Sequence, residues 1–78
     1  MKLVVVLEKI ESNWAAYTPH DGLCVNACAD TREATISLFV DALRFHLDGM
    51  REAGQPFPEI TALEIHETLP LPASLAAA

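Results

Sequence analysis

The stretch WAAYTPHDGLCVNACADTREA, residues 14–34, decides how this chain folds. Residues 14–18 alternate their side chains between two faces, as a strand does, and Pro19 ends the strand because proline has no N–H for a sheet ladder. Asp21-Gly22 favours a chain reversal, since both residues tolerate positive φ. Residues 23–29 alternate again and predict a strand that returns antiparallel to the first.

The end of this stretch predicts the start of a helix. Asp30 or Thr31 can serve as the N-cap, and Asp30 and Glu33 have the spacing of a capping box. Gly54, followed by prolines at 56 and 58, predicts the end of a helix of about 23 residues. Between these ends, apolar residues recur at helical spacing at Ile36, Phe39, Val40, Leu43, Leu47 and Met50.

The flanking segments add two strands and complete the fold class. Residues 2–8 form a short apolar run bounded by charge, and a polar turn at residues 9–13 follows them. Residues 60–67 alternate apolar and polar side chains and predict a strand with one polar side. We therefore predict an α+β domain of order β-β-β-α-β, with an antiparallel meander, a fourth strand and one long helix packed on the sheet. The domain covers residues 1–68, and residues 69–78 are predicted to be a flexible tail.

Length and charge limit the classes of function. The chain has 78 residues and a formal charge of −6, which argues against direct DNA binding and favours a basic partner. The apolar run near Leu3 is too short for a signal peptide or a membrane span, so we expect a cytoplasmic protein that does not bind membranes.

The cysteines and histidines do not predict a catalytic site. Cys24 and Cys28 in an extended strand lie roughly 13 Å apart, too far for a disulfide. They also lack the second ligand pair of a zinc site, so ordinary thiols are favoured over a metal or redox role. His20-Asp21 beside Cys24 has no orienting third group, and His46 and His66 are expected on the surface. We predict no enzyme activity, no catalytic residue, no metal and no cofactor.

The helix carries more apolar surface than one small sheet covers. This surplus indicates either a broad core face or packing against another chain. A core this small also favours self-association. We predict a homo-oligomer, a dimer or a tetramer, formed through a sheet edge or through the helix at Leu38, Ala42, Phe45 and Gly49.

The segment NWAAYTPHDGLCVNACADTREA, residues 13–34, resembles the HicB-like antitoxin family. In that family an aromatic–small–aromatic strand leads to Pro-Asp-Leu-Pro-Gly-Cys and then to a Gly-Asp-Thr helix start. The resemblance extends over about residues 3–68. The matching positions are residues 14–17, Pro19, Gly22, Cys24, Asp30, Thr31, Glu33, residues 41–47 and residues 54–58.

The resemblance implies a partial ribonuclease H-like fold and an antitoxin that covers the catalytic histidine of a small basic HicA-type mRNA-cleaving toxin. Full-length members add a C-terminal DNA-binding module, which has no counterpart in this sequence, so operator binding is not expected. The partner-binding residues that we predict from the densest part of the resemblance are Pro19, His20, Asp21, Gly22, Leu23, Asp30, Thr31 and Glu33.

Two other functions remain open from the sequence. One is a stand-alone oligomeric protein of this fold with no toxin partner and an unknown ligand. The other is a nuclease, which needs clustered carboxylates holding two divalent metals about 4 Å apart. The acidic residues are spread over several predicted elements, so this second alternative is the weaker one.

Overall fold

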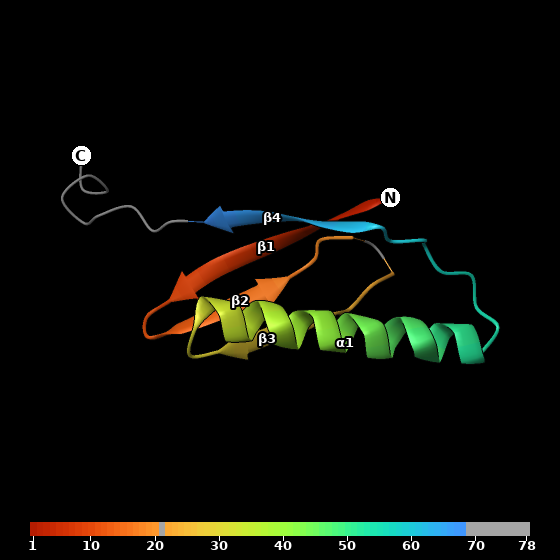
Figure 1. Cartoon of the computed structure of the whole chain (residues 1–78), viewed down its shortest axis with the longest axis horizontal. Helices are drawn as coiled ribbons and strands as arrows, with labels where there is room; N and C mark the ends of the chain where they lie inside the picture. Colours follow the sequence, from red (N-terminus) through yellow and green to blue (C-terminus); the bar gives the residue numbers. More distant parts are fainter. Residues whose placement is uncertain (21, 69–78) are drawn as a thin grey trace.

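The computed structural model describes residues 1–20 and 22–68 and shows a four-stranded sheet with one helix (Figure 1). The order β-β-β-α-β and the α+β class confirm the prediction, whereas the predicted tail, residues 69–78, lies outside the described residues. The elements are β1 (Lys2–Ile10), β2 (Asn13–Tyr17), β3 (Asn26–Ala29), α1 (Arg32–Glu52) and β4 (Ala62–Thr68).

The sheet is mixed, with the strand order β3-β2-β1-β4. β1, β2 and β3 pair antiparallel in sequence, which confirms the predicted meander. β4 pairs parallel to β1, with Leu3 opposite Leu63 and Val5 opposite Ile65. Two parallel neighbouring strands have to be joined by a crossover connection, and α1 with the segment after it forms this crossover before β4. β1 is therefore an inner strand, and β3 and β4 are the two edges.

A tight turn joins β1 to β2. Ile10 pairs with Asn13, so Glu11 and Ser12 alone form the connection, which is shorter than the predicted turn at residues 9–13. Glu11 has a φ of 54°, the left-handed conformation that two-residue hairpin loops demand. This turn thus uses a glutamate where a glycine is usual.

The third strand is shorter than predicted. Residues 23–29 alternate as a strand does, but only Asn26–Ala29 pairs with β2. The ladder ends where Tyr17 pairs with Asn26, because β2 itself ends at Tyr17, ahead of Pro19. Leu23 and Val25 are nevertheless buried in the core. The prediction was right about burial and wrong about pairing.

The helix is capped at both ends. Thr31 is the N-cap, and its Oγ1 accepts a hydrogen bond of 3.1 Å from the N–H of Ala34. The predicted capping box of Asp30 and Glu33 is wrong, because with Thr31 as N-cap the third helical position is Ala34.

The helix α1 ends just before Gly54, as predicted. Gly54 has a φ of 70° and donates its N–H to the carbonyl oxygen of Arg51 over 3.1 Å. The N–H of Gln55 donates to the carbonyl oxygen of Met50 over 2.9 Å. These two bonds form a Schellman motif, which satisfies carbonyls that the last helical turn leaves free.

The core lies between α1 and one face of the sheet. Phe39 and Leu43 of the helix meet the inward side chains of β1, which are almost completely buried. The helix approaches β3 and β2 most closely and leaves β4 uncovered (Figure 1). The buried apolar residues are Leu3, Val5, Leu7, Ala16, Leu23, Val25, Phe39 and Leu43.

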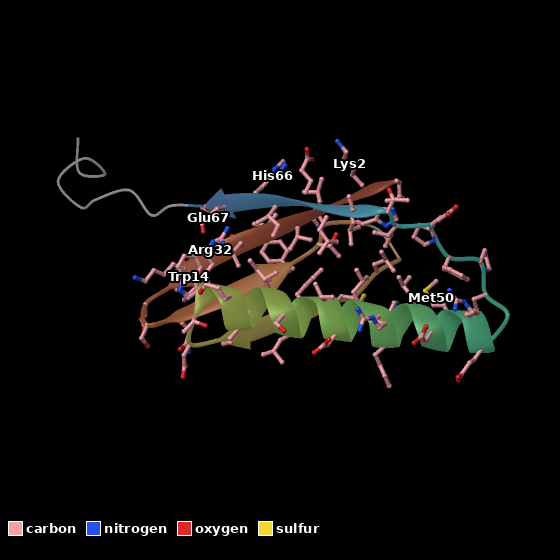
Figure 2. All side chains as sticks on the ribbon, viewed as in Figure 1. Lys2, Trp14, Arg32, Met50, His66 and Glu67 are labelled. Atoms are coloured by element: carbon pink, nitrogen blue, oxygen red, sulfur yellow. The ribbon has the colours of Figure 1, made fainter. Side chains whose placement is uncertain are left out.

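No helix of the described residues lies over the opposite face of the sheet. Lys2 and His66 project from this face, away from α1 (Figure 2). The hydroxyl of Tyr17 donates to Oε1 of Glu8 over 3.1 Å on the same face. Polar side chains thus cover much of the open face.

Candidate functional site

The loop after β2 holds the first group of predicted partner-binding residues. Pro19, His20 and Gly22 are exposed, and Asp21 lies outside the described residues. Leu23 is only 4% exposed because it fills the core, so its side chain is not presented to a partner.

Thr18 anchors this loop to the sheet. Its hydroxyl donates to the carbonyl oxygen of Val4 over 2.8 Å and accepts from the N–H of His20 over 3.3 Å. The buried Thr18 thus fixes the position at which His20 leaves the sheet.

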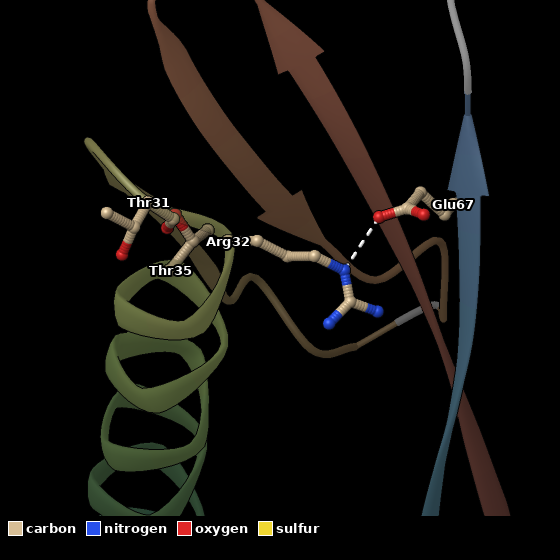
Figure 3. A network of polar contacts seen from close by, with 4 residues as sticks. All are labelled: Thr31, Arg32, Thr35 and Glu67. Atoms are coloured by element: carbon tan, nitrogen blue, oxygen red, sulfur yellow. Dashed lines mark hydrogen bonds and ion pairs between the residues drawn. The ribbon is translucent and has the colours of Figure 1, made fainter.

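The helix start holds the second group. Asp30, Thr31 and Glu33 are exposed, and the Thr31 hydroxyl is engaged as the helix cap. Arg32 turns toward β4, where its Nε lies 2.7 Å from Oε1 of Glu67 (Figure 3). This ion pair ties the start of the helix to the strand that the helix does not cover.

The two predicted groups do not form one contiguous site. β3 runs from the loop toward the helix start, so the groups lie at opposite ends of that strand (Figure 1). A partner that contacts both groups has to span the length of β3 and the segment before it. The predicted strand over residues 23–29 already implies this separation, since it runs between the two groups.

Between these two ends lies a groove of about 490 Å³. Its floor and walls come from the segment entering β3 and from the middle of α1. The lining residues are Cys24, Val25, Asn26, Leu38, Asp41, Ala42, Phe45 and His46. Three of the four predicted oligomer-interface residues, Leu38, Ala42 and Phe45, are among them, and Gly49 is exposed further along the helix. The groove itself was not predicted, although the surplus of apolar residues on the helix was its signal.

The two cysteines are free and exposed. Cys28 lies in β3, whereas Cys24 lies before the strand and lines the groove. The structure therefore corrects their expected placement together in one strand.

The histidines lie on separate elements. His20 follows β2, His46 lies on α1, and His66 on β4 comes within 3.3 Å of Glu64. Within residues 1–20 and 22–68, no three His, Cys, Asp or Glu side chains gather in a group that could hold a metal ion. The described histidines therefore offer isolated side chains rather than a shared site.

No helix in the described part of the chain is long and apolar enough to cross a membrane. The features that remain for a functional argument are the groove, the exposed acids and the two sheet edges. Comparison of the chain with protein-family models, curated proteins and solved structures gives no match.

Proposed function

We propose that this chain is a HicB-like, antitoxin-type binding module that neutralises a small basic HicA-type mRNA-cleaving toxin. Two features support the proposal. The resemblance of residues 13–34 to that family implies the order β-β-β-α-β, and the chain has this order. The second feature is the distribution of charge.

The observation that carries the proposal is a surplus of carboxylates over cationic side chains. The chain has eleven Asp and Glu against five Lys and Arg. Among the described residues, ion pairs form only between Arg32 and Glu67 and between His66 and Glu64. The other described acids form no ion pair with described residues, and the net negative charge attracts a basic protein and repels nucleic-acid phosphates.

The helix start is the contact region that we assign to the toxin. Asp30 and Glu33 are exposed there and have no ion-pair partner among the described residues. Arg32, the nearby cation, is turned away toward Glu67 over 2.7 Å. A basic side chain of a partner therefore meets two acids at this end without competition from Arg32.

A charge-reversal experiment tests the proposal. The protein is titrated by calorimetry with a HicA-type protein, taken from a neighbouring reading frame or from the nearest available source, and growth is followed when the two are co-expressed. We expect a complex that weakens as salt rises, because charges near the surface are screened within about 8 Å at physiological ionic strength. Glu33→Lys should weaken the complex about tenfold or more, since it places a cation where the toxin is basic.

Glu59→Lys is the matched control, because it changes the net charge equally in the connection between α1 and β4, where the Glu59 carbonyl oxygen accepts from the N-terminus over 2.7 Å. It should alter affinity by less than about threefold. No complex at low salt and no rescue of growth would overturn the proposed function. Equal losses in both variants would overturn the assigned contact region.

A further inference from the structure

We propose that the outer face of α1 binds an amphipathic helix of another protein, one that carries lysine or arginine beside its apolar residues. The outer face is the stripe formed by Leu38, Asp41, Phe45, Asp48 and Glu52. All these side chains are exposed, on the side of α1 that no other described element covers (Figure 1). The proposal rests on the pattern of apolar and acidic side chains along this stripe and does not depend on the proposed function.

The spacing of the outer face is that of a contact between two helices. Its members follow one another at alternating intervals of three and four residues. Side chains at these intervals stay on one side of a helix and face the partner in a coiled coil. The stripe is about 21 Å long at 1.5 Å per residue, so about four turns of a second helix can pack along it.

Two apolar side chains anchor the contact. Phe45 is 83% exposed and Leu38 is 48% exposed. A phenylalanine side chain removes on the order of 150 Å² or more from water when it is covered, so Phe45 offers a large apolar contact to a partner. Both side chains line the groove of about 490 Å³ together with Val25, and this groove gives an apolar side chain of the partner helix a recess to fill.

The acidic side chains of the outer face determine which kind of helix fits. Asp41, Asp48 and Glu52 alternate with the apolar anchors and form no ion pair with described residues. A helix with cations beside its apolar residues places an ammonium or guanidinium group near each of these carboxylates while its apolar side covers Phe45.

The arginines of α1 do not neutralise this face. Arg32 is held by Glu67, with its Nε 2.7 Å from the carboxylate. The guanidinium of Arg51 lies 5.2 Å from the centroid of the Phe57 ring. Arg44 lies beside the outer face and forms no ion pair with any described acid. The carboxylates of the outer face are therefore available to a cationic partner.

The same acids disfavour a second copy of this chain as the occupant. Two outer faces placed together bring carboxylates against carboxylates, and each copy carries a formal charge of −6. Charges that flank the apolar seam of a coiled coil select the partner in this way, by repelling like charge and attracting opposite charge.

The helix start that we assign to the toxin is a different surface. Glu33 lies about 120° around α1 from Phe45, at about 100° per residue. Asp30 precedes the helix. A toxin bound at the helix start does not need the outer face, so the two proposals are tested with different probes and can fail separately.

A labelled synthetic peptide tests the proposal by fluorescence anisotropy. The probe is a helical peptide of three heptads, with leucines in one stripe, lysines beside them and alanines elsewhere. One control peptide has glutamate in place of lysine, and the other has the same composition with the leucines dispersed around the helix. We expect the probe to bind about tenfold or more tighter than either control, and its affinity to fall as salt rises.

Variants of the apolar anchor locate the contact. Phe45→Ala should weaken binding of the probe about tenfold or more, because buried aromatic anchors contribute much of the energy of an interface. Ile10→Ala is the matched control, since Ile10 is 53% exposed but lies at the end of β1. It should leave the affinity within about twofold. Circular dichroism checks that both variants are folded.

Variants of the acids test the choice of partner. Asp41→Asn combined with Asp48→Asn should weaken binding of the probe about fivefold, the effect of two exposed ion pairs. Glu11→Gln combined with Glu59→Gln is the control, because it changes the net charge equally at two exposed positions outside α1. It should leave the affinity within about twofold.

Several results would overturn the proposal. They are failure of the probe to bind, equal binding of all three peptides, and equal losses in a variant and its control. Sedimentation velocity of the protein alone identifies the competing occupant. If the probe does not bind and the protein forms a dimer that Phe45→Ala dissociates, the outer face belongs to a second copy and the proposal is wrong.

Discussion

At the scale of single residues, the contact between Tyr17 and Glu8 connects the second strand to the first on the open face of the sheet. The phenol donates a hydrogen bond of 3.1 Å to the Glu8 carboxylate. This bond, with desolvation and the negative charge of Glu8 as further causes, raises the pKa of Tyr17 above its ordinary value of 10.0. The neutral phenol is therefore favoured in the folded state.

We predict that Glu8→Gln lowers the pKa of Tyr17 toward 10.0, because it removes the anionic acceptor. Tyr17 is the only tyrosine in the chain, so an ultraviolet absorbance titration reports it alone. Since the pKa is raised on folding, the stabilisation from this contact is complete below pH 10.0 and is lost as the pH rises through the folded-state value. An unchanged titration curve in the variant would contradict this assignment.

Burial of single residues was largely predictable, whereas their polar contacts were not. Phe39 and Leu43 recur at helical spacing, and that spacing alone assigns them to one face. The hydroxyl of Thr35 is different, because it is fully buried and donates over 2.7 Å to the carbonyl oxygen of Thr31. Thr35 stands four residues before Phe39, on the same helical face, but its polar side chain carries no apolar signal for burial and does not indicate its hydrogen-bond acceptor. That information comes from packing.

At the scale of elements, the sequence predicts the order and approximate extent of the strands and the helix, but not every partner. The meander follows from short connections, which join neighbouring antiparallel strands. The pairing of β4 with β1 does not follow, because residues 53–61 connect α1 to β4 without indicating where β4 adds. The limit of β3 was missed for another reason: the sequence indicates where β2 ends but not the register in which Tyr17 pairs with Asn26.

Alanine substitution at two glycines of the helix region should change the free energy of unfolding in opposite directions. Gly54 has a φ of 70°, so Gly54→Ala forces a left-handed alanine and should lower the free energy of unfolding by about 1 kcal/mol. Gly49 lies inside α1, and a Cβ there meets no atom within 4 Å. Gly49→Ala should therefore raise the free energy of unfolding by about 0.5 to 1 kcal/mol.

Urea denaturation at low protein concentration measures both changes without a contribution from self-association. If the two alanine substitutions changed the free energy of unfolding equally, the role of Gly54 in the C-terminal cap of α1 would be contradicted.

At the scale of the whole molecule, the helix covers only part of its sheet. It lies nearest β3 and β2, and its link to β4 includes the ion pair of Arg32 and Glu67. These two side chains are 41% and 34% exposed, so solvent screens the pair and its contribution is below about 1 kcal/mol. The position of β4 therefore depends mainly on its pairing with β1 and on half-buried Leu63 and Ile65.

Hydrogen exchange should reveal this uneven support. We predict the slowest backbone exchange in β1, which has a paired strand on each side, and faster exchange in β4, which is paired on one side and not covered by the helix. Mass spectrometry of peptides covering Lys2–Ile10 and Ala62–Thr68 compares the two strands in one sample. Equal protection of both strands would contradict this prediction.

The parallel pairing of β1 with β4 also bears on how the chain is made. A ribosome releases β1 first and β4 last among the described elements, yet the two become neighbours in the sheet. As long as β4 is unpaired, β2, β3 and α1 can assemble on one side of β1 while its other side stays open. An unpaired strand edge is a template for aggregation. A folding intermediate in which β4 has not yet paired therefore exposes one edge of β1, and this is the species of the chain most open to aggregation.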